Sequence, residues 1–179
     1  LIGYFPALLA YAYQAKASYF DNKTLHLRHP SPELSTAENI LRMLRSDGSY
    51  TDLEAKCLDL CLVLHAEHGG GNNSAFTTHL VSSSGTDTYS AISAAIGSLK
   101  GPKHGGANEV AYDIQKRYRN ADEAEADIRE RIGRKEIVIG FGHPVYTISD
   151  PRNVVIKEVA RGLSNETGDR RLFDIAERL

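Results

Sequence analysis

Residues 51–64, TDLEAKCLDLCLVL, carry the pattern that decides the fold class. Thr51 and Glu54 stand three positions apart at its start, and this pairing is the capping box that satisfies free N–H groups at a helix N-terminus. Apolar residues then occupy nearly every face of the helix, which is typical of a helix with neighbours all round. The stretch therefore predicts a long, deeply buried helix.

Helix signals recur on both sides of this stretch. Ser35 and Glu38 form a second capping box, Asp87 can cap a helix rich in Ala and Ser, and Pro151 suits a first helical position. Further helices are expected in segments 1–13, from about 73, after 105, in 122–133 and after 168. The chain is therefore predicted to be all-α, with residues 137–139 as a short extended segment or minor strand.

The composition is that of an ordinary globular protein. Of the 179 residues, 41% are hydrophobic and 25% are charged, and 21 Lys and Arg face 23 Asp and Glu. This balance gives no reason to expect nucleic acid or a membrane as a partner, and the apolar segment 1–13 is too short to span a bilayer. Cys57 and Cys61 have helix spacing, so we expect reduced thiols and a cytoplasmic protein.

Three histidine clusters, each beside glycine, are the candidates for chemistry. The first is HAEHGGGN, residues 65–72, and it fits the C-terminus of a helix, where glycine adopts the left-handed cap and histidine suits the helix dipole. Zinc chelation by His65 and His68 is an alternative. The spacing is not that of a metalloprotease and further ligands are missing, so no metal is expected.

The second cluster is GPKHGGAN, residues 101–108, with His104 just before a predicted helix. The dipole at a helix N-terminus disfavours a further positive charge. A neutral imidazole there can donate a hydrogen bond to a carbonyl that is becoming an enolate. A capping histidine packed among glycines is the structural alternative.

The third cluster is GFGHPV, residues 140–145, followed by Asp150, Pro151 and Arg152. Its glycine pair suggests a dinucleotide site and hence an NAD-dependent dehydrogenase, but Val145 stands in the third glycine position and no βαβ pattern surrounds it. His143 could equally be an incidental loop residue. Arg152 offers a bidentate clamp for a carboxylate.

In their order and spacing, the segments 65–72, 101–108, 140–143 and 150–152 resemble the citrate synthase family, and the resemblance spans essentially the whole chain. The branch that includes 2-methylcitrate synthase is also similar, notably in HAEH and GGANE. The resemblance implies a citrate-synthase-like multihelical homodimer, with residues 1–105 in a large helical domain and 106–179 in a small one.

The same resemblance implies an activity. It is the condensation of acetyl-CoA with oxaloacetate and water to citrate and CoA, with no tightly bound cofactor and a coenzyme A thioester as cosubstrate. A 2-methylcitrate synthase that uses propionyl-CoA is an alternative, because one methylene in an apolar pocket is worth only about 1–3 kcal/mol. A non-catalytic module that binds CoA or dicarboxylate, or that dimerises, is an alternative of another class.

The resemblance also implies roles for individual residues. His104 matches the histidine that polarises the thioester carbonyl and stabilises the enol, and His143 matches the one that hydrogen-bonds the oxaloacetate carbonyl. The positions that match dicarboxylate-binding residues are His68, Asn72 and Arg152. The backbone that matches the contact with the CoA adenine is formed by Ile137, Val138, Ile139, Gly140, Phe141 and Gly142.

The chain departs from the family at its end. The family's general base is an aspartate that follows the last helix predicted here, and further substrate-binding arginines lie beyond it. This sequence stops at Leu179, before any of them. We therefore expect the chain to be the middle of a subunit and to be inactive by itself.

Overall fold

The computed structural model describes residues 1–67, 71–141 and 146–179, and every regular element in these ranges is a helix. This confirms the all-α prediction. No helix in that part of the chain is long and apolar enough to cross a membrane. The chain divides into two compact units, Leu1–Ala66 and Glu67–Leu179. The predicted boundary between a large and a small helical domain lies elsewhere, after residue 105. That domain assignment stays a prediction.

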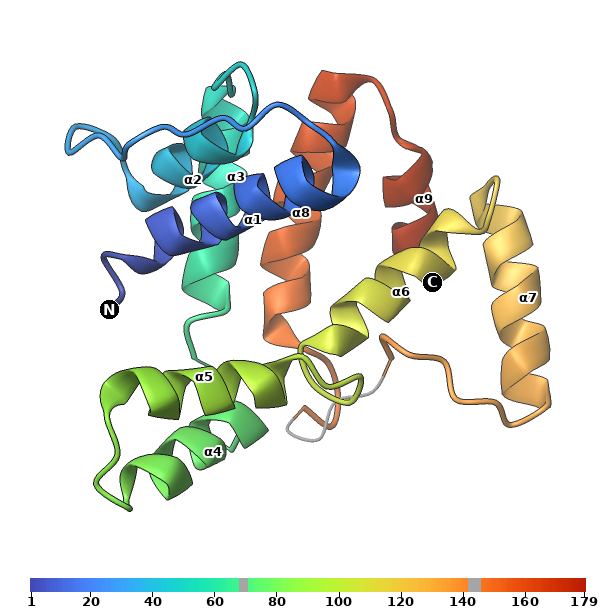
Figure 1. Ribbon diagram of the computed structural model, residues 1–179. Helices are drawn as coiled ribbons and strands as arrows, with labels where there is room; N and C mark the ends of the chain where they lie inside the picture. Colours follow the sequence, from blue (N-terminus) through green and yellow to red (C-terminus); the bar gives the residue numbers. More distant parts are fainter. Residues whose placement is uncertain (68–70, 142–145) are drawn as a thin grey trace. The chain divides into compact units, whose positions relative to one another are not determined.

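The first unit is built from α1 (Phe5–Asp21), α2 (Thr36–Leu44) and α3 (Asp52–Leu64), which Figure 1 labels. Both predicted capping boxes are present at the starts of α2 and α3. The buried side chain of Gln14, on α1, donates hydrogen bonds to the carbonyls of Met43 (3.1 Å) and Leu44 (2.9 Å). Because these carbonyls end α2, Gln14 both caps that helix and holds α1 against it.

The prediction that α3 is deeply buried is wrong for this unit. Ala55 is the one buried residue of the helix, and Val63 is 64% exposed. A helix that is apolar on all sides needs packing partners on all sides. Within the unit α3 packs against α2, which covers only part of its circumference.

An ion pair joins the end of α2 to the start of α3, and it predicts acid-sensitive stability. Glu54 accepts two hydrogen bonds from Arg45, at 2.8 and 2.6 Å, and one from the backbone N–H of Thr51. The Arg45 guanidinium, helped by that N–H, lowers the pKa of Glu54 from 4.5 to about 2. The stabilisation is therefore fully present above pH 4.5 and is lost as the pH falls towards 2.

We expect Glu54→Gln to lower the free energy of unfolding at pH 7 by about 1 kcal/mol, since the pair is partly exposed to solvent. Urea unfolding at pH 7 and at pH 3 measures this, and the deficit of the variant should shrink at the lower pH. Glu33→Gln, at an exposed position of the same unit, is the control. A deficit that does not change with pH would contradict the assignment.

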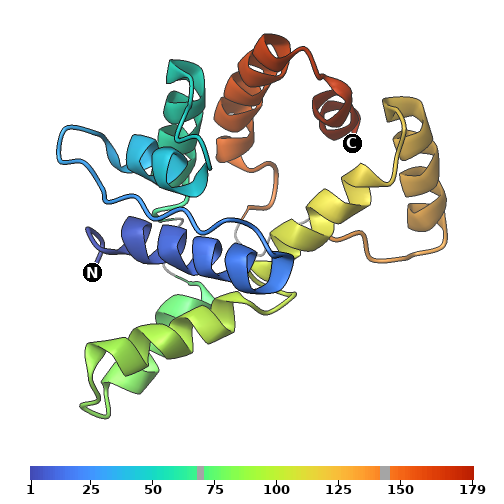
Figure 2. The same ribbon diagram turned by 45° about the horizontal axis from the view of Figure 1, so that its top comes forward.

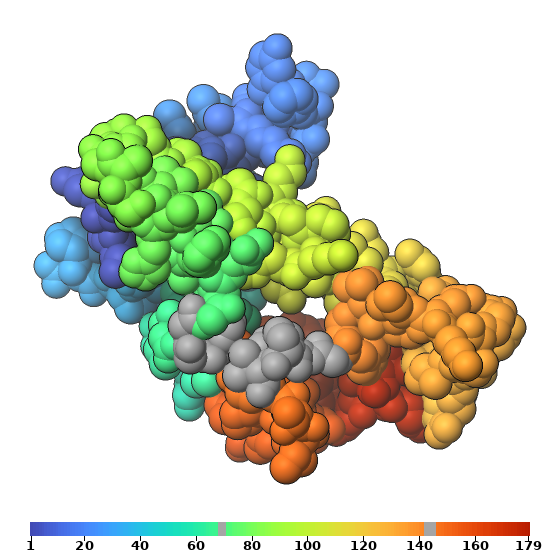
Figure 3. All heavy atoms as spheres, turned by 90° about the horizontal axis from the view of Figure 1, so that it is seen from below, coloured from blue at the N-terminus to red at the C-terminus, as the bar shows by residue number. Residues whose placement is uncertain are grey.

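The second unit contains α4 (Asn73–Ser82), α5 (Thr88–Leu99), α6 (Gly106–Lys116), α7 (Ala121–Gly133), α8 (Pro151–Thr167) and α9 (Arg171–Arg178). The first two form a helical hairpin, whose partners lie against one another in the space-filling view of Figure 3. Ala91 and Ala95 are buried on α5, as expected from its Ala- and Ser-rich sequence. This hairpin carries one half of the candidate site.

The core of the second unit gathers side chains from α6, α7, α9 and the loops that follow α6 and α7. Its buried members are Ile114, Tyr118, Ala124, Ile128, Val138 and Ile175. Figure 2 shows α9 beside α7, where the two helices pack. The phenol of Tyr118 donates to Asp127 (2.6 Å), and Arg171 donates to the carbonyl of Tyr118 (2.8 Å). The core thus fixes both α6 and the loop that contains Val138.

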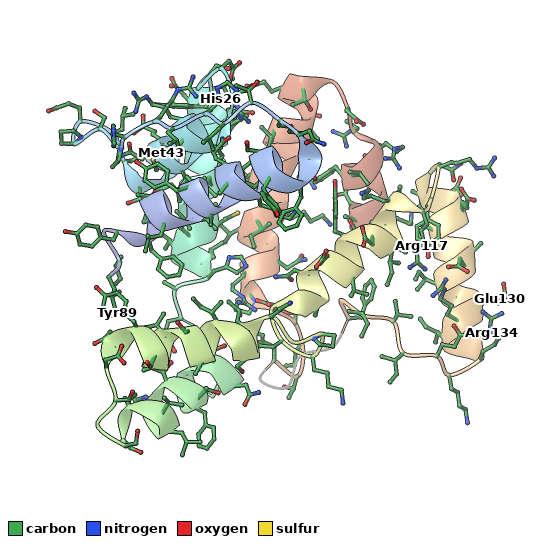
Figure 4. The ribbon with its side chains drawn as sticks, in the orientation of Figure 1. His26, Met43, Tyr89, Arg117, Glu130 and Arg134 are labelled. Carbon is green, nitrogen blue, oxygen red and sulfur yellow. The ribbon has the colours of Figure 1, made fainter. Side chains whose placement is uncertain are left out.

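The helix α7 carries many charged side chains. Arg134 donates to Glu130 four residues earlier, and the two side chains lie together at one end of the helix in Figure 4. Such pairs on a helix surface each contribute only a few tenths of a kcal/mol. These charged side chains favour exposure of this face of α7 to solvent.

Candidate functional site

His104 lies in the short connection between α5 and α6 and is held by a serine from α4. Its Nε2 is 2.5 Å from Oγ of Ser74, and the tautomer of the ring decides which atom donates. The backbone N–H of His104 also donates to the carbonyl of Gly101 (2.9 Å). Both the imidazole and its serine partner are half-buried, so the ring has a fixed orientation and stays accessible.

Two glycines allow the tight connection that places His104. A Cβ on Gly106 would lie 2.5 Å from the carbonyl oxygen of Lys100 and 2.9 Å from that of Gly101. A Cβ on Gly105 would lie 2.7 Å from the side chain of Leu99. The backbone at the start of α6 therefore passes so close to the end of α5 that no side chain fits between them.

Asn72 caps the helix that carries Ser74. Its Oδ1 accepts a hydrogen bond from the N–H of Ala75 (2.7 Å), which leaves its amide N–H groups for other partners. A hollow of about 470 Å³ opens here, lined by Gly71, Asn72, Asn73, Phe76 and His79. The start of α4 thus holds Asn72 directly and His104 through Ser74, and these two predicted site residues come together.

Arg152 lies in the first turn of α8 and is paired with Asp150. Its Nε and Nη2 donate to the two carboxylate oxygens of Asp150, at 2.9 and 2.6 Å, and its guanidinium lies 5.3 Å from the ring centre of Tyr146. The Asp150 hydrogen bonds raise the pKa of Arg152. Among the described contacts, none joins Arg152 to His104 directly.

The segment predicted to contact CoA is an irregular loop against α6, and in the part that is described it forms no strand. Val138 is buried and Ile139 packs against the core, whereas Ile137 is 88% and Phe141 51% exposed. Gly140 has φ +105°, and a Cβ there would lie 2.9 Å from that of Ala111 on α6. The loop is thus anchored on the same helix that follows His104, with two apolar side chains turned to solvent.

Some predicted site residues lie outside the described ranges, namely His68, Gly142 and His143. His65 is described: it ends α3, and its Nδ1 is 2.6 Å from the carbonyl of Cys61, which confirms a helix C-terminus at the first cluster. The zinc alternative depends on His68 and is not decided. In residues 1–67, 71–141 and 146–179, no three His, Cys, Asp or Glu side chains are grouped to hold a metal.

A second hollow, of about 640 Å³, lies between α7 and α9 and holds no predicted site residue. Its lining consists of Arg119, Asn120, Ala121, Asp122, Arg171, Asp174, Glu177 and Arg178. Charges of both signs are paired there, as Arg178 is with Asp122 at 2.9 Å. Its lining holds carboxylates but no histidine, serine or cysteine.

Sequence reasoning missed Ser74. The contact with His104 joins positions 30 residues apart, and no local pattern reports it. The available signal was its place in the first turn of a predicted helix, two residues after Asn72.

Comparison with known proteins adds to this geometry. The profile of the family described as "Citrate synthase, C-terminal domain" matches residues 1–179. The chain is 40% identical over 148 residues to a citrate synthase of Deinococcus radiodurans, covering 83% of this chain and 39% of that protein. It is 34% identical over 176 residues to a 2-methylcitrate synthase of Shewanella oneidensis, covering 98% of this chain and 45% of the relative.

A solved structure is also similar. It is the ternary complex of carboxymethyl coenzyme A and oxaloacetate with the citrate synthase of Thermoplasma acidophilum, with a TM-score of 0.81 and 28% identity, over 96% of this chain and 44% of that one. The chain therefore spans less than half the length of these relatives.

Proposed function

The chain belongs to the citrate synthase family, and from this premise we propose that its site condenses an acyl-CoA thioester with oxaloacetate to citrate or 2-methylcitrate. The observation that carries the proposal is the hydrogen bond of Ser74 with His104, beside Asn72 at the start of α4. Because the relatives are about twice as long, we assign the activity to the extended subunit, meaning this chain within a polypeptide of the relatives' length.

In this proposal Ser74 sets the tautomer of His104. When the serine hydroxyl donates to Nε2, the proton of the neutral ring lies on Nδ1. That N–H can donate to the thioester carbonyl and stabilise the negative charge that develops as the enol forms. The family resemblance places the general base, an aspartate, beyond residue 179, so the chain itself supplies the electrophilic part of the step and is expected to be inactive alone.

The remaining predicted residues divide between the two substrates. Among the described contacts the amide N–H groups of Asn72 have no partner, and Arg152 is a cation that suits a carboxylate, so both are assigned to oxaloacetate together with His68. His143 is assigned to the oxaloacetate carbonyl by resemblance alone. The exposed apolar side chains of Ile137 and Phe141 suit a loop that receives the planar adenine of CoA.

Assembly and compartment are proposed as well. A homodimer is supported by exposed apolar residues on α4, where Phe76 and Leu80 are 64% and 59% exposed. A cytoplasmic location agrees with the free thiols of Cys57 and Cys61.

The experiment that tests the function incubates the extended subunit with oxaloacetate and either acetyl-CoA or propionyl-CoA. We expect free CoA and the matching tricarboxylate in equal amounts, and kcat/KM for the two donors decides which one is preferred. Binding of both substrates without any product would favour the non-catalytic alternative instead. The 179-residue chain, assayed in parallel, should form no product.

A variant of Ser74 tests the tautomer argument. We expect Ser74→Ala to lower kcat of the extended subunit about tenfold. Loss of a residue that orients a functional group typically lowers activity about 10–100-fold. Thr77→Val is the matched control, since the Thr77 hydroxyl donates to the carbonyl of Asn73 within its own helix. Equal activity of the two variants would show that Ser74 does not orient the ring.

A further inference from the structure

The position of Arg152 in its helix is electrostatically unusual. It is the second residue of α8, and the N-terminus of a helix carries a partial positive charge that disfavours a cation. Asp150, the N-cap residue, accepts a hydrogen bond from the backbone N–H of Arg152 at 2.9 Å. A carboxylate at this position offsets both the dipole and the guanidinium, and so allows an arginine where one is normally unfavourable.

The same carboxylate also fixes the side chain. Asp150 Oδ1 lies 2.9 Å from Nε of Arg152, and Oδ2 lies 3.1 Å from Nε and 2.6 Å from Nη2. The ring of Tyr146 lies against the guanidinium. The Arg152 side chain is 19% exposed and that of Asp150 32% exposed, so solvent screens the pair only in part.

We propose that Asp150 is the positioning residue that holds the Nε and Nη2 edge of Arg152, so that its Nη1 group is presented to an anionic ligand. Within the described residues Nη1 has no hydrogen-bond partner, while the opposite edge is occupied. The identity of the ligand as the dicarboxylate rests on the proposed function. The orientation of the guanidinium does not.

Because the guanidinium is already held in one orientation, less conformational entropy of the arginine side chain is lost when a ligand binds. A free arginine has many rotamers, whereas one with two hydrogen bonds to a carboxylate and a ring beside it keeps a single orientation. Loss of the Asp150 charge should therefore weaken binding rather than strengthen it. Strengthening is the result expected if Asp150 merely competed with the ligand for Arg152.

The test follows the Nε–Hε signal of Arg152 by NMR in the 179-residue chain while oxaloacetate is added. The variants are Asp150→Asn, which keeps a capping oxygen without the charge, and Asp150→Ser, which keeps a cap that is too short for the guanidinium. Asp87→Asn is the matched control, because Asp87 caps α5 through Ser90 and pairs with no arginine in the described contacts. Thermal unfolding of each variant separates capping from positioning.

We expect a slowly exchanging Hε signal in the unchanged chain, its loss in both Asp150 variants, and about tenfold weaker oxaloacetate binding in them. Asp87→Asn should lose similar stability but keep both the signal and the affinity. An unaltered Hε signal, or equal or tighter binding in Asp150→Asn, would overturn the positioning role. If neither the unchanged chain nor the extended subunit binds oxaloacetate, the proposed substrate is refuted, and the Hε signal alone then decides whether Asp150 fixes Arg152.

Discussion

Replacing His104 with alanine is expected to lower kcat of the extended subunit by about 10²–10³, with little change in KM for oxaloacetate. The reason is that a donor aimed at a developing oxyanion acts in the transition state and hardly in the ground state. The Ser74 hydrogen bond, at 2.5 Å, gives the ring the fixed orientation that such a donor needs. Steady-state kinetics with acetyl-CoA and oxaloacetate measure the effect.

His26→Ala is the matched control for this variant. His26 belongs to the loop between α1 and α2 in the first unit and is labelled in Figure 4. Its replacement should leave kcat unchanged. If His104→Ala raised KM and left kcat normal, His104 would bind the substrate and the transition state equally well. Its proposed role in stabilising the enol would then be wrong.

Replacing Gly106 with alanine is the second change with a large expected effect. The new Cβ would lie 2.5 Å from the carbonyl oxygen of Lys100, and neither the Cβ, which is fixed directly to the backbone, nor this backbone oxygen can rotate away. Overpacking of this kind typically costs about 1–3 kcal/mol, so we expect a loss in free energy of unfolding near the upper end of that range. Because the start of α6 must shift, the contact of Ser74 with His104 should be lost too.

Gly97→Ala supplies the matched control. Gly97 lies inside α5, and a Cβ added there would meet no atom within 4 Å beyond its own helix backbone and chain neighbours. Alanine at this position should stabilise the chain by about 0.5–1 kcal/mol through helix propensity. Urea unfolding of the two variants gives the comparison. Equal stability of Gly106→Ala and Gly97→Ala would mean that the end of α5 and the start of α6 are not in close contact.

The helices were predictable because their signals are local. The capping boxes at Ser35 and Thr51, and the cap at Asp87, each involve residues three positions apart, and all are present. The burial of α3 was not predictable in this way. An apolar sequence states that a helix can be buried, but the neighbours that would bury it are a property of the assembled fold.

The candidate site likewise contains residues that local motifs predict and partners that only the structure reveals. The residue types and their order identified Asn72, His104 and Arg152 as candidates, since each stands in a short motif with a chemical reason for it. The partners that orient them needed the structure, because Ser74 reaches His104 across 30 positions. The double use of Asp150, as helix cap and as carboxylate for Arg152, also appears only when side-chain distances are known.

The most direct measurement is a crystal structure of the extended subunit with oxaloacetate and carboxymethyl coenzyme A bound. We predict that Nδ1 of His104 lies about 2.7–3.1 Å from an oxygen of the analogue's carboxymethyl group, with His143 on the opposite side of the same cleft, against the oxaloacetate carbonyl. Ligands seated elsewhere, or imidazoles that share no cleft, would contradict the condensation chemistry.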